Sequence, residues 1–530
     1  MFRDRWISAL LSNTGTWMQD TAATWLMTVL TTSPFLIALM QTAASLPVLF
    51  LGLPAGAIAD ILDRRRLLMF WQLWMLAAAV LLSVITFAGW IGPGTLLGLT
   101  LLLSVGAAMN NPAWQAIVPE LVPRSELAEA ISLNSANYNV ARAVGPALGG
   151  LSMALFANAY IGGGVVFFIN GLSFAFVILM LYRWKRQPLY TSELPAERLL
   201  GSMRAGIRYV RHARDMQSIL IRTFIMTSCV SAMWALLAVV AQQDLAHGAL
   251  GYGMLNASIG SGAVLGAIFL PRLRRRVSHD VIVAVSAVVF TVTLLIMAFA
   301  HLTVLLVLVL IAAGFAWTST TSCFNIAVQI SVPAWVKARA LGTYQMTFQA
   351  GMALGSAFWG YVAEHTSTPI ALSAAAAGLM IGVPLGLRYQ LMSNAAADLD
   401  SAQAKGLTRA APTVLMELEP EDGPLLISVE YRIDPSEVEE FVKSIHDLKT
   451  IRLRDGGMRW GLFADAANPA RYVETFLVES WAEYLRQRER LTVSDLDVRD
   501  RVQAFQRGDG PPTVSRMVYV PTSDSRGDQG

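Results

Sequence analysis

Asp20 and Arg142 are ionisable residues that lie deep inside long apolar stretches of the sequence. Each lies about fourteen residues into its stretch, a depth of ~21 Å along a helix. A charge inside a lipid bilayer is costly, so such residues usually belong to ion or substrate pathways. The pair is therefore a candidate site for proton coupling or for binding a charged substrate group. A static ion pair that holds two helices together is the alternative.

Aromatic and amide side chains also recur within the apolar stretches. Such groups can line a cavity for a bulky amphipathic molecule, although most aromatic residues in such stretches are packed or interfacial. The cavity candidates are Trp17, Gln19, Trp114, Gln115, Trp234, Trp317, Tyr344, Gln345 and Gln349. Arg222 differs from Asp20 and Arg142, because it lies near the start of its stretch, from where its side chain can reach the aqueous surface.

Metal and cofactor chemistry finds little support in the sequence. The two cysteines, Cys229 and Cys323, both lie inside apolar stretches, so neither a disulfide framework nor a zinc site can be built from them. A phosphate-binding loop of the Walker type is missing from the sequence, which makes ATP an unexpected direct energy source. We therefore expect no cofactor and no metal.

The apolar stretches that carry these residues dominate the chain. A mean hydropathy of +0.50 and 55% hydrophobic residues are too apolar for a soluble protein of 530 residues. A helix needs ~20 apolar residues to cross the ~30 Å hydrocarbon core of a bilayer. Twelve membrane helices are predicted, at residues 6–30, 35–59, 67–90, 95–116, 128–155, 161–182, 217–241, 252–271, 280–300, 302–328, 338–363 and 368–390.

Basic residues fall in alternate gaps between the twelve stretches. Because cytoplasmic loops carry the excess of Lys and Arg, this pattern predicts a multi-pass protein of a bacterial inner membrane with both termini in the cytoplasm. Up to residue 390 the sequence has 23 Lys and Arg against 13 Asp and Glu, whereas the remainder has 17 against 24. The acidic remainder indicates a separate soluble domain. The basic clusters are short and each abuts an apolar stretch, so no nucleic-acid partner is expected.

The longest internal gap divides the stretches six and six. We expect an N-terminal bundle at residues 1–182, a cytoplasmic linker at 183–216 and a C-terminal bundle at 217–390. Residues 197–214 of that linker form either an amphipathic helix on the membrane surface or an ordinary charged connection. A second linker at residues 391–423, a soluble domain at 424–520 and a disordered tail at 521–530 follow.

The soluble domain has the pattern of an α+β fold. Strands are predicted at residues 425–433, 458–463, 471–480 and 513–520, and helices at 436–449 and 481–506. The order β-α-β-β-α-β is that of a ferredoxin-like sandwich. The whole chain is thus predicted to be an all-α membrane protein of 6+6 helices followed by a ferredoxin-like domain.

The connection between the second and third stretches resembles the G-x-x-x-D-R-x-G-R-R loop of the major facilitator superfamily. Glycine permits close packing at the helix end, and an aspartate accepts hydrogen bonds from the N-terminus of a facing helix. In that family the loop latches the two halves in the outward-facing state. The resemblance implies this role for Gly56, Asp60, Arg64 and Arg65. Ile61 and Asp63 depart from the motif, and a degenerate echo follows the eighth stretch, at residues 262–276.

The fifth stretch is similar to the G-P-x-x-G-G element of exporters and antiporters in the same superfamily. Glycine and proline within a helix weaken its backbone hydrogen bonding and permit a kink and close packing, which suits a moving gate. Simple small-residue packing is the alternative. The gating residues implied by the resemblance are Gly145, Pro146, Gly149 and Gly150.

Other segments resemble one branch of that superfamily, the bacterial transmembrane secretion effectors, which include enterobactin-type siderophore exporters. They are residues 12–19, 110–115, 119–123 and 340–345. The resemblance covers the whole membrane part. Residues 480–487 look like part of the soluble tail found on some members, which is similar to antibiotic-biosynthesis-monooxygenase-type domains.

The resemblance implies a secondary transporter that exports a small amphipathic molecule, such as a drug or a siderophore, in exchange for protons by alternating access. An importer or facilitator on the same fold is one alternative, and a membrane-anchored monooxygenase-type enzyme is another. We expect a transporter and not an enzyme. The expected partners are a small-molecule substrate, protons and the lipid bilayer, with self-association through the C-terminal domain, whose role we expect to be regulatory or dimerising.

Overall fold

The computed structural model describes residues 2–117, 127–183, 208–244, 248–300, 302–388, 391, 416–508 and 510–520. Several predictions lie outside these residues. They include the motif at residues 119–123, most of the linker at 183–216, the greater part of the linker at 391–423 and the tail at 521–530.

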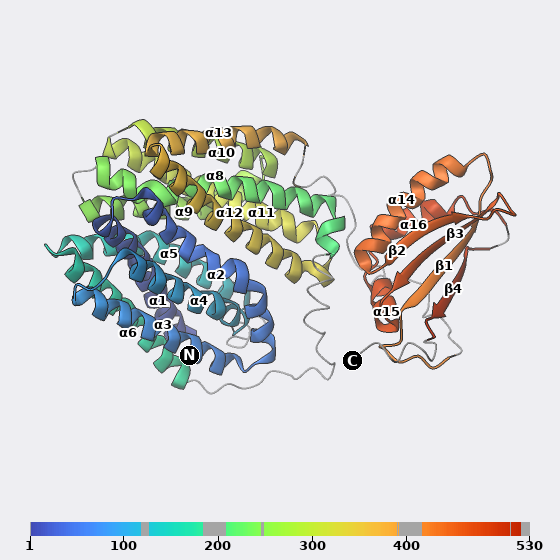
Figure 1. Ribbon diagram of the computed structural model, residues 1–530, viewed down its shortest axis with the longest axis horizontal. Helices are drawn as coiled ribbons and strands as arrows, with labels where there is room; N and C mark the ends of the chain where they lie inside the picture. The colour runs from blue at the N-terminus through green and yellow to red at the C-terminus, as the bar shows by residue number, and fades with distance from the viewer. Residues whose placement is uncertain are drawn as a thin grey trace. The chain divides into compact units, whose positions relative to one another are not determined.

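Each of the twelve apolar stretches coincides with a long α-helix (Figure 1). Among the described residues, eight helices are long and apolar enough to cross a membrane: α2, α3, α4, α6, α8, α9, α10 and α11. Helix α13 is also apolar, but its apolar segment, Thr368–Pro384, is shorter. The chain is therefore a multi-pass membrane protein. The bounds are α1 Phe2–Leu30, α2 Pro34–Ile61, α3 Arg64–Phe87, α4 Pro93–Ile117, α5 Leu127–Ala154, α6 Ala159–Arg183, α8 Arg214–Asp244, α9 Gly248–Arg274, α10 His279–Phe299, α11 Thr303–Ile330, α12 Lys337–His365 and α13 Thr368–Arg388.

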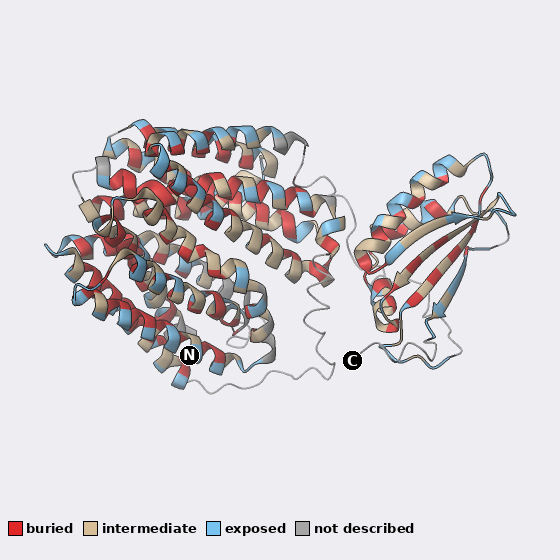
Figure 2. Cartoon of the chain, viewed as in Figure 1, coloured by how far each residue is buried: buried red, intermediate tan, exposed pale blue. Residues whose placement is uncertain are grey.

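Local signals fix where the helices begin. Ser33 is the N-cap of α2, where its side chain accepts a hydrogen bond from the backbone of Leu36 and Pro34 occupies the first turn. Asp63 caps α3 in the same way by accepting from the backbone N of Arg66. Many large apolar residues of the helices are exposed, and exposed residues recur along the helices in Figure 2, as expected where lipid replaces water as the solvent.

Helices α1–α6 form a first helix group and α8–α13 a second, and their glycines reveal a repeat. In the fifth helix of the first group, α5, Gly145 and Gly149 face the first helix, α1. In the fifth helix of the second group, α12, Gly351 and Gly355 face the first helix, α8. The same spacing of four residues puts both glycines of each pair on one helix face. The two groups therefore use equivalent packing.

The chain divides into two compact units. The first comprises Met1–Pro195, Ile219–Ile326 and Tyr344–Leu391, and the second comprises Ala196–Ser218, Ala327–Thr343 and Met392–Gly530. The C-terminal part of the second unit contains a four-stranded antiparallel sheet of order β2-β3-β1-β4, with its helices on one face (Figure 1). The bounds are β1 Leu425–Arg432, α14 Val438–Asp455, β2 Met458–Ala464, β3 Arg471–Val478, α15 Trp481–Glu489, α16 Val493–Gln503 and β4 Thr513–Val518.

The core of this sheet domain follows from strand periodicity. Alternate residues of β1, from Leu425 to Tyr431, are buried against Phe441 and Ile445 of α14. One prediction is wrong here, because residues 481–506 form two helices and not one. The helix is interrupted before Thr492, which forms a capping box with Asp495. The side chain of each residue accepts a hydrogen bond from the backbone N–H of the other. This cap starts a new helix and ends the continuous one.

Candidate functional site

Helix α5 lies between α1 and α9, and glycines permit both contacts. A Cβ atom at Gly149 would lie 2.7 Å from the backbone oxygen of Met18 in α1. A Cβ atom at Gly150 would lie 2.7 Å from the backbone oxygen of Ala249 in α9, and one at Gly253 would lie 2.8 Å from Cα of Gly150. Helices of different groups therefore touch backbone to backbone at this junction.

The predicted charged residues lie beside this junction. Cζ of Arg142 is 5.6 Å from the ring centroid of Trp17, a cation–π contact. The rings of Trp17 and Tyr138 meet edge to face with their centroids 6.0 Å apart. Tyr138 lies within electrostatic range of both Arg142 and Asp20. Within the described residues, no ion pair joins Asp20 to Arg142, and Arg142 instead contacts the aromatic face of Trp17.

Asp20 and Tyr138 are both exposed, and 50% of the surface of Tyr138 is accessible. We call the group formed by Trp17, Asp20, Tyr138 and Arg142 the α1–α5 site. Tyr138 was not among the sequence candidates, although its place four residues before Arg142 puts both on one helix face.

Helix α9 adds an aromatic residue near the α1–α5 site. Tyr252 is within electrostatic range of Asp20, and the side chains of Thr24 and Asn256 lie close to its hydroxyl. Its ring stacks on Trp25 with the centroids 5.9 Å apart. Both helix groups therefore contribute side chains to the surroundings of Asp20.

Three predicted cavity residues of the second helix group form a packed aromatic cluster. The ring centroids of Trp234 and Trp317 are 4.4 Å apart, and Phe348 lies 5.4 Å from Trp317 and 6.2 Å from Tyr344. Trp317 and Tyr344 are buried. Phe348 was missed, although it follows Tyr344 by four residues and so shares its helix face.

The remaining cavity candidates do not gather at one place. Gln19 is buried and accepts a hydrogen bond of 2.7 Å from Asn170 of α6. Trp114 packs against the apolar cluster around Leu68. Gln115 and Gln345 are exposed, and Gln349 is half-buried. Within the described residues, no three His, Cys, Asp or Glu side chains are grouped so that they could hold a metal ion.

The loop between α2 and α3 is tied to its own helix group. Nε and Nη2 of Arg65 donate to the backbone oxygens of Leu181 and Tyr182, at 2.9 and 2.6 Å. A cation at the C-terminus of α6 is favoured by the helix dipole. Arg64 donates to the backbone of Ala59 at 3.3 Å. No atom of the described residues lies within 4 Å of a Cβ atom built at Gly56, so the close packing expected there is not seen among them.

Two residues of this loop need separate remarks. The side chain of Asp60 lies outside the described part of the chain. Asp63, which departs from the family motif, is the N-cap of α3 and accepts a 2.9 Å hydrogen bond from the backbone of Arg66. An aspartate just before a helix is a common start signal, so the departure has a local structural reason.

Several contacts join the two helix groups near the end of the molecule where α1 ends and α2 begins, which we call the α1–α2 end. Oε2 of Glu364, in α12, accepts hydrogen bonds from Oγ of Ser33 at 2.8 Å and from the backbone N of Phe35 at 3.4 Å. Nearby, Gln242 of α8 donates to the backbone oxygen of Thr28 at 2.8 Å. Hydrogen bonds therefore join the two groups at this end.

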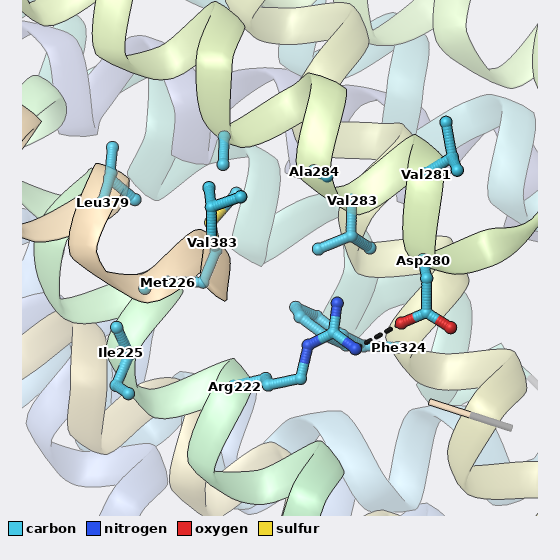
Figure 3. A pocket seen from close by; sticks show the side chains of 12 residues that line it. Arg222, Ile225, Met226, Asp280, Val281, Val283, Ala284, Phe324, Leu379 and Val383 are labelled. Carbon is cyan, nitrogen blue, oxygen red and sulfur yellow. Dashed lines mark hydrogen bonds and ion pairs between the residues drawn. The ribbon is translucent and has the colours of Figure 1, made fainter. Parts of the chain in front are cut away.

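A separate cavity lies within the second helix group, between α8, α10, α11 and α13 (Figure 3). Its volume is about 180 Å³, and apart from Arg222 and Asp280 its lining is apolar. Arg222 points toward Asp280 and forms an ion pair with it (Figure 3). The expectation that Arg222 reaches the aqueous surface is wrong, because its side chain is only 7% exposed. A nearby carboxylate makes this buried position tolerable.

Comparison with known proteins gives the fold a family. Residues 1–524 match the family described as transmembrane secretion effector. The staphyloferrin A transporter of Staphylococcus aureus is 22% identical over 59% of this chain and 78% of the relative. The multidrug efflux pump Tap of Mycolicibacterium fortuitum is 24% identical over 67% of this chain and 88% of the relative.

Solved structures agree with this at the level of fold. The nucleoside transporter NupG superposes with a TM-score of 0.59 at 14% identity, over 73% of this chain and 98% of NupG. A bacterial homologue of the iron transporter ferroportin, in an inward-facing state, gives 0.57 at 14% identity over the same shares. The chain therefore belongs to the transmembrane secretion effector family of the major facilitator superfamily, and it is a membrane transporter and not an enzyme.

Proposed function

We propose that this transporter exports a small amphipathic molecule, such as a drug or a siderophore, in exchange for protons. Alternating access would come from rocking of two bundles, residues 1–182 and 217–390, about the α5–α9 junction. The observation that carries the proposal is the α1–α5 site, where Asp20, Tyr138 and Arg142 lie beside a glycine-lined contact between the two helix groups. The names of the two relatives favour a small-molecule cargo.

The alternation of basic gaps supports an orientation with all twelve helices in the bacterial inner membrane and both termini in the cytoplasm. The α1–α2 end then faces outward. Because Glu364 and Ser33 join the two groups there, we infer that this state is closed to the outside and that the α1–α5 site is reached from the cytoplasm. Such a state would load cargo from the cytoplasm, as an exporter requires.

We assign the coupling role to Asp20. An arginine that moves against a carboxyl group favours the charged form of that group, and its withdrawal favours protonation. In the present state Arg142 lies over Trp17, so a rotation of α5 relative to α1 would change the distance between the two charges. Proton release from Asp20 would thereby follow the movement of the helices.

Transport into inverted membrane vesicles tests this assignment. A pH gradient should drive uptake of a fluorescent drug by the wild-type protein, and a protonophore should abolish it. Asp20→Asn should remove the response to the gradient. Asp63→Asn is the matched control, because asparagine caps a helix about as well as aspartate does. Gradient-driven uptake by Asp20→Asn at the wild-type rate would reject the role of Asp20.

The same vesicles distinguish export from import. An exporter accumulates the compound in inverted vesicles and lowers its level in intact cells, whereas an importer or facilitator raises the cellular level. A panel of dyes, antibiotics and siderophores, compared in cells with and without the protein, identifies the cargo class.

For the soluble domain we propose the ferredoxin-like fold and a regulatory or self-associating role. The element order and the strand order β2-β3-β1-β4 support the fold, since a split β-α-β arrangement brings β1 and β3 to the centre of the sheet. Deleting residues after about 395 tests the role: retained export with altered regulation or oligomeric state supports it. Unchanged transport and unchanged oligomeric state argue against it.

A further inference from the structure

The second compact unit contains more than the sheet domain. It includes residues 208–212, a helical turn just before α8, and the connection between α11 and α12, which contains the short helix η3 at Ala334–Val336. Contacts between these segments and the sheet domain are therefore internal to one unit.

An aromatic pair joins the two connecting segments. The rings of Tyr209 and Trp335 meet edge to face, with their centroids 5.7 Å apart and their planes at 86°. Tyr209 is only 3% exposed. Burial raises the pKa of its phenol, so the hydroxyl stays protonated and a cation is attracted by the face of a neutral ring.

Two arginines of the sheet domain cover these two rings. Cζ of Arg454, at the end of α14, lies 5.6 Å from the ring centroid of Tyr209. Cζ of Arg490, which follows α15, lies 4.6 Å from that of Trp335. Both distances are within the ~6 Å at which a cation is attracted to an aromatic face, and the attraction is larger where water is excluded.

Carboxylates hold both arginines in place. Arg454 forms ion pairs with Asp455 at 2.8 Å and with Asp495 at 2.7 Å. Although burial alone would lower it, the pKa of Arg454 is raised well above its ordinary value by these two carboxylates. Arg490 pairs with Glu483 at 2.6 Å and donates to the backbone oxygen of Asp455 at 2.8 Å.

The charges continue into the segment before α8. Glu483 also accepts from Arg208 at 2.8 Å, so one carboxylate lies between a cation of the sheet domain and a cation of the connecting segment. Removing one partner of such a buried network leaves the others uncompensated, which is strongly unfavourable. The contact is therefore specific in both its shape and its charge.

We propose that the sheet domain holds Tyr209, before α8, and Trp335, between α11 and α12, in one contact, which we call the grip. Because of this contact the two connections move as one body during transport, and we call this role of the sheet domain the brace. The contacts lie within the second unit, and a rocking motion of whole bundles would leave them intact. The effect on transport rests on the proposed alternating-access function, whereas the grip itself does not.

Limited trypsin digestion of the full-length protein in inverted vesicles tests the grip. The double variant Tyr209→Leu with Trp335→Leu removes both rings and changes no side chain of the sheet domain. Cleavage after Arg208 and Arg211 should become roughly tenfold faster, because cleavage follows the population of the open form. Tenfold corresponds to about 1.4 kcal/mol. Arg490→Ala should act in the same direction from the other side of the contact.

Arg499→Ala is the matched control, because within the described part of the chain Arg499 forms its ion pair with its own neighbour Asp500 and not with either connecting segment. Trypsin resistance of Arg452, whose side chain is largely buried, reports that the sheet domain stays folded. Unchanged cleavage of the double variant would overturn the grip. Faster cleavage with undiminished transport would overturn the brace. If no tested compound is transported by the wild type, the proposed function fails while the cleavage result still decides the grip.

Discussion

Glu364 at the end of α12 and Ser33 at the start of α2 are joined by a 2.8 Å hydrogen bond that crosses from one helix group to the other. Ser33 is also the N-cap of α2, so the carboxylate lies against the N-terminus of a helix. The dipole of α2 favours an anion at this position, and the backbone N of Phe35 points to the same oxygen at 3.4 Å. The N-cap residue of α2 therefore also takes part in the contact that joins the two helix groups at the α1–α2 end.

Glu364→Gln should weaken this closure. An amide can still accept from Ser33 but loses the charge that interacts with the helix dipole, a loss of ~0.3–1 kcal/mol. The open form should become about two- to fivefold more populated. A cysteine placed at Thr28, which lies behind the contact, should react correspondingly faster with a membrane-impermeant thiol reagent applied from outside the cell.

The matched control is Glu439→Gln, which makes the same change on an exposed helix of the sheet domain. Ser33→Ala should act in the same direction as Glu364→Gln, because it removes both the cross-group bond and the cap. Labelling that is unchanged or slower in both variants would mean that the hydrogen bond does not hold this end closed.

Gly150→Ala should stop the transport cycle. A Cβ atom there would lie 2.7 Å from the backbone oxygen of Ala249 and 2.8 Å from Cα of Gly253, and neither backbone atom can move without shifting α9. We expect the two groups to be forced apart at the α5–α9 junction, with transport reduced to a small fraction of the wild-type rate in vesicles.

Gly98→Ala separates this effect from that of helix propensity. In the part of the chain that the structure describes, no atom lies within 4 Å of a Cβ atom at Gly98 of α4, so alanine fits there and favours the helix by ~0.5–1 kcal/mol. Transport by Gly98→Ala should equal that of the wild type. Normal transport by Gly150→Ala would show that the two helices can separate without cost.

Arg65→Gln should destabilise the first helix group. Arg65 donates two hydrogen bonds to backbone oxygens at the C-terminus of α6. A hydrogen bond from a charged group contributes up to ~3 kcal/mol to the free energy of unfolding. Thermal unfolding in detergent should show a lower midpoint than for Arg66→Gln, since Arg66 is exposed. Equal midpoints would mean that the hydrogen bonds of Arg65 do not stabilise this state, and would favour a role for Arg65 in the outward-facing state alone.

The positions of the helices could be predicted well because hydrophobic length is a local property. Each of the twelve apolar stretches coincides with a helix, with boundaries a few residues away from those expected. The strands of the sheet domain could be predicted for the same reason, from alternation of apolar residues. The interruption before Thr492 could not be predicted in this way, because the pattern of a charged segment indicates one continuous helix unless its internal capping box is recognised.

The candidate site was predicted only in part, because contacts across helices depend on rotation about each helix axis. Asp20 and Arg142 lie at similar depths in their apolar stretches, and the sequence therefore predicts that they form one site. The rotation of α5 about its axis instead directs the Arg142 side chain to the ring of Trp17. Gly253 could not be paired with Gly150 from sequence either, since the crossing point of α5 and α9 is a property of the assembled bundle. Arg222 was misjudged because its partner Asp280 lies on another helix.

Trp17→Leu should reduce transport far more than Trp17→Phe. The ring of Trp17 provides a face for Arg142 and an edge contact for Tyr138, and phenylalanine preserves both in weakened form. Leucine leaves the guanidinium without its aromatic partner, a loss of ~0.5–2 kcal/mol. The measurement is the rate of gradient-driven uptake in inverted vesicles, normalised to the amount of protein.

Trp90→Leu is the control for loss of an indole, because Trp90 is 80% exposed in the connection between α3 and α4. It should transport at the wild-type rate. If Trp17→Leu and Trp17→Phe both transport normally, Arg142 does not depend on the aromatic face. In that case the distance between Arg142 and Asp20 cannot be set by Trp17, and the coupling role would need a different means of moving one charge relative to the other.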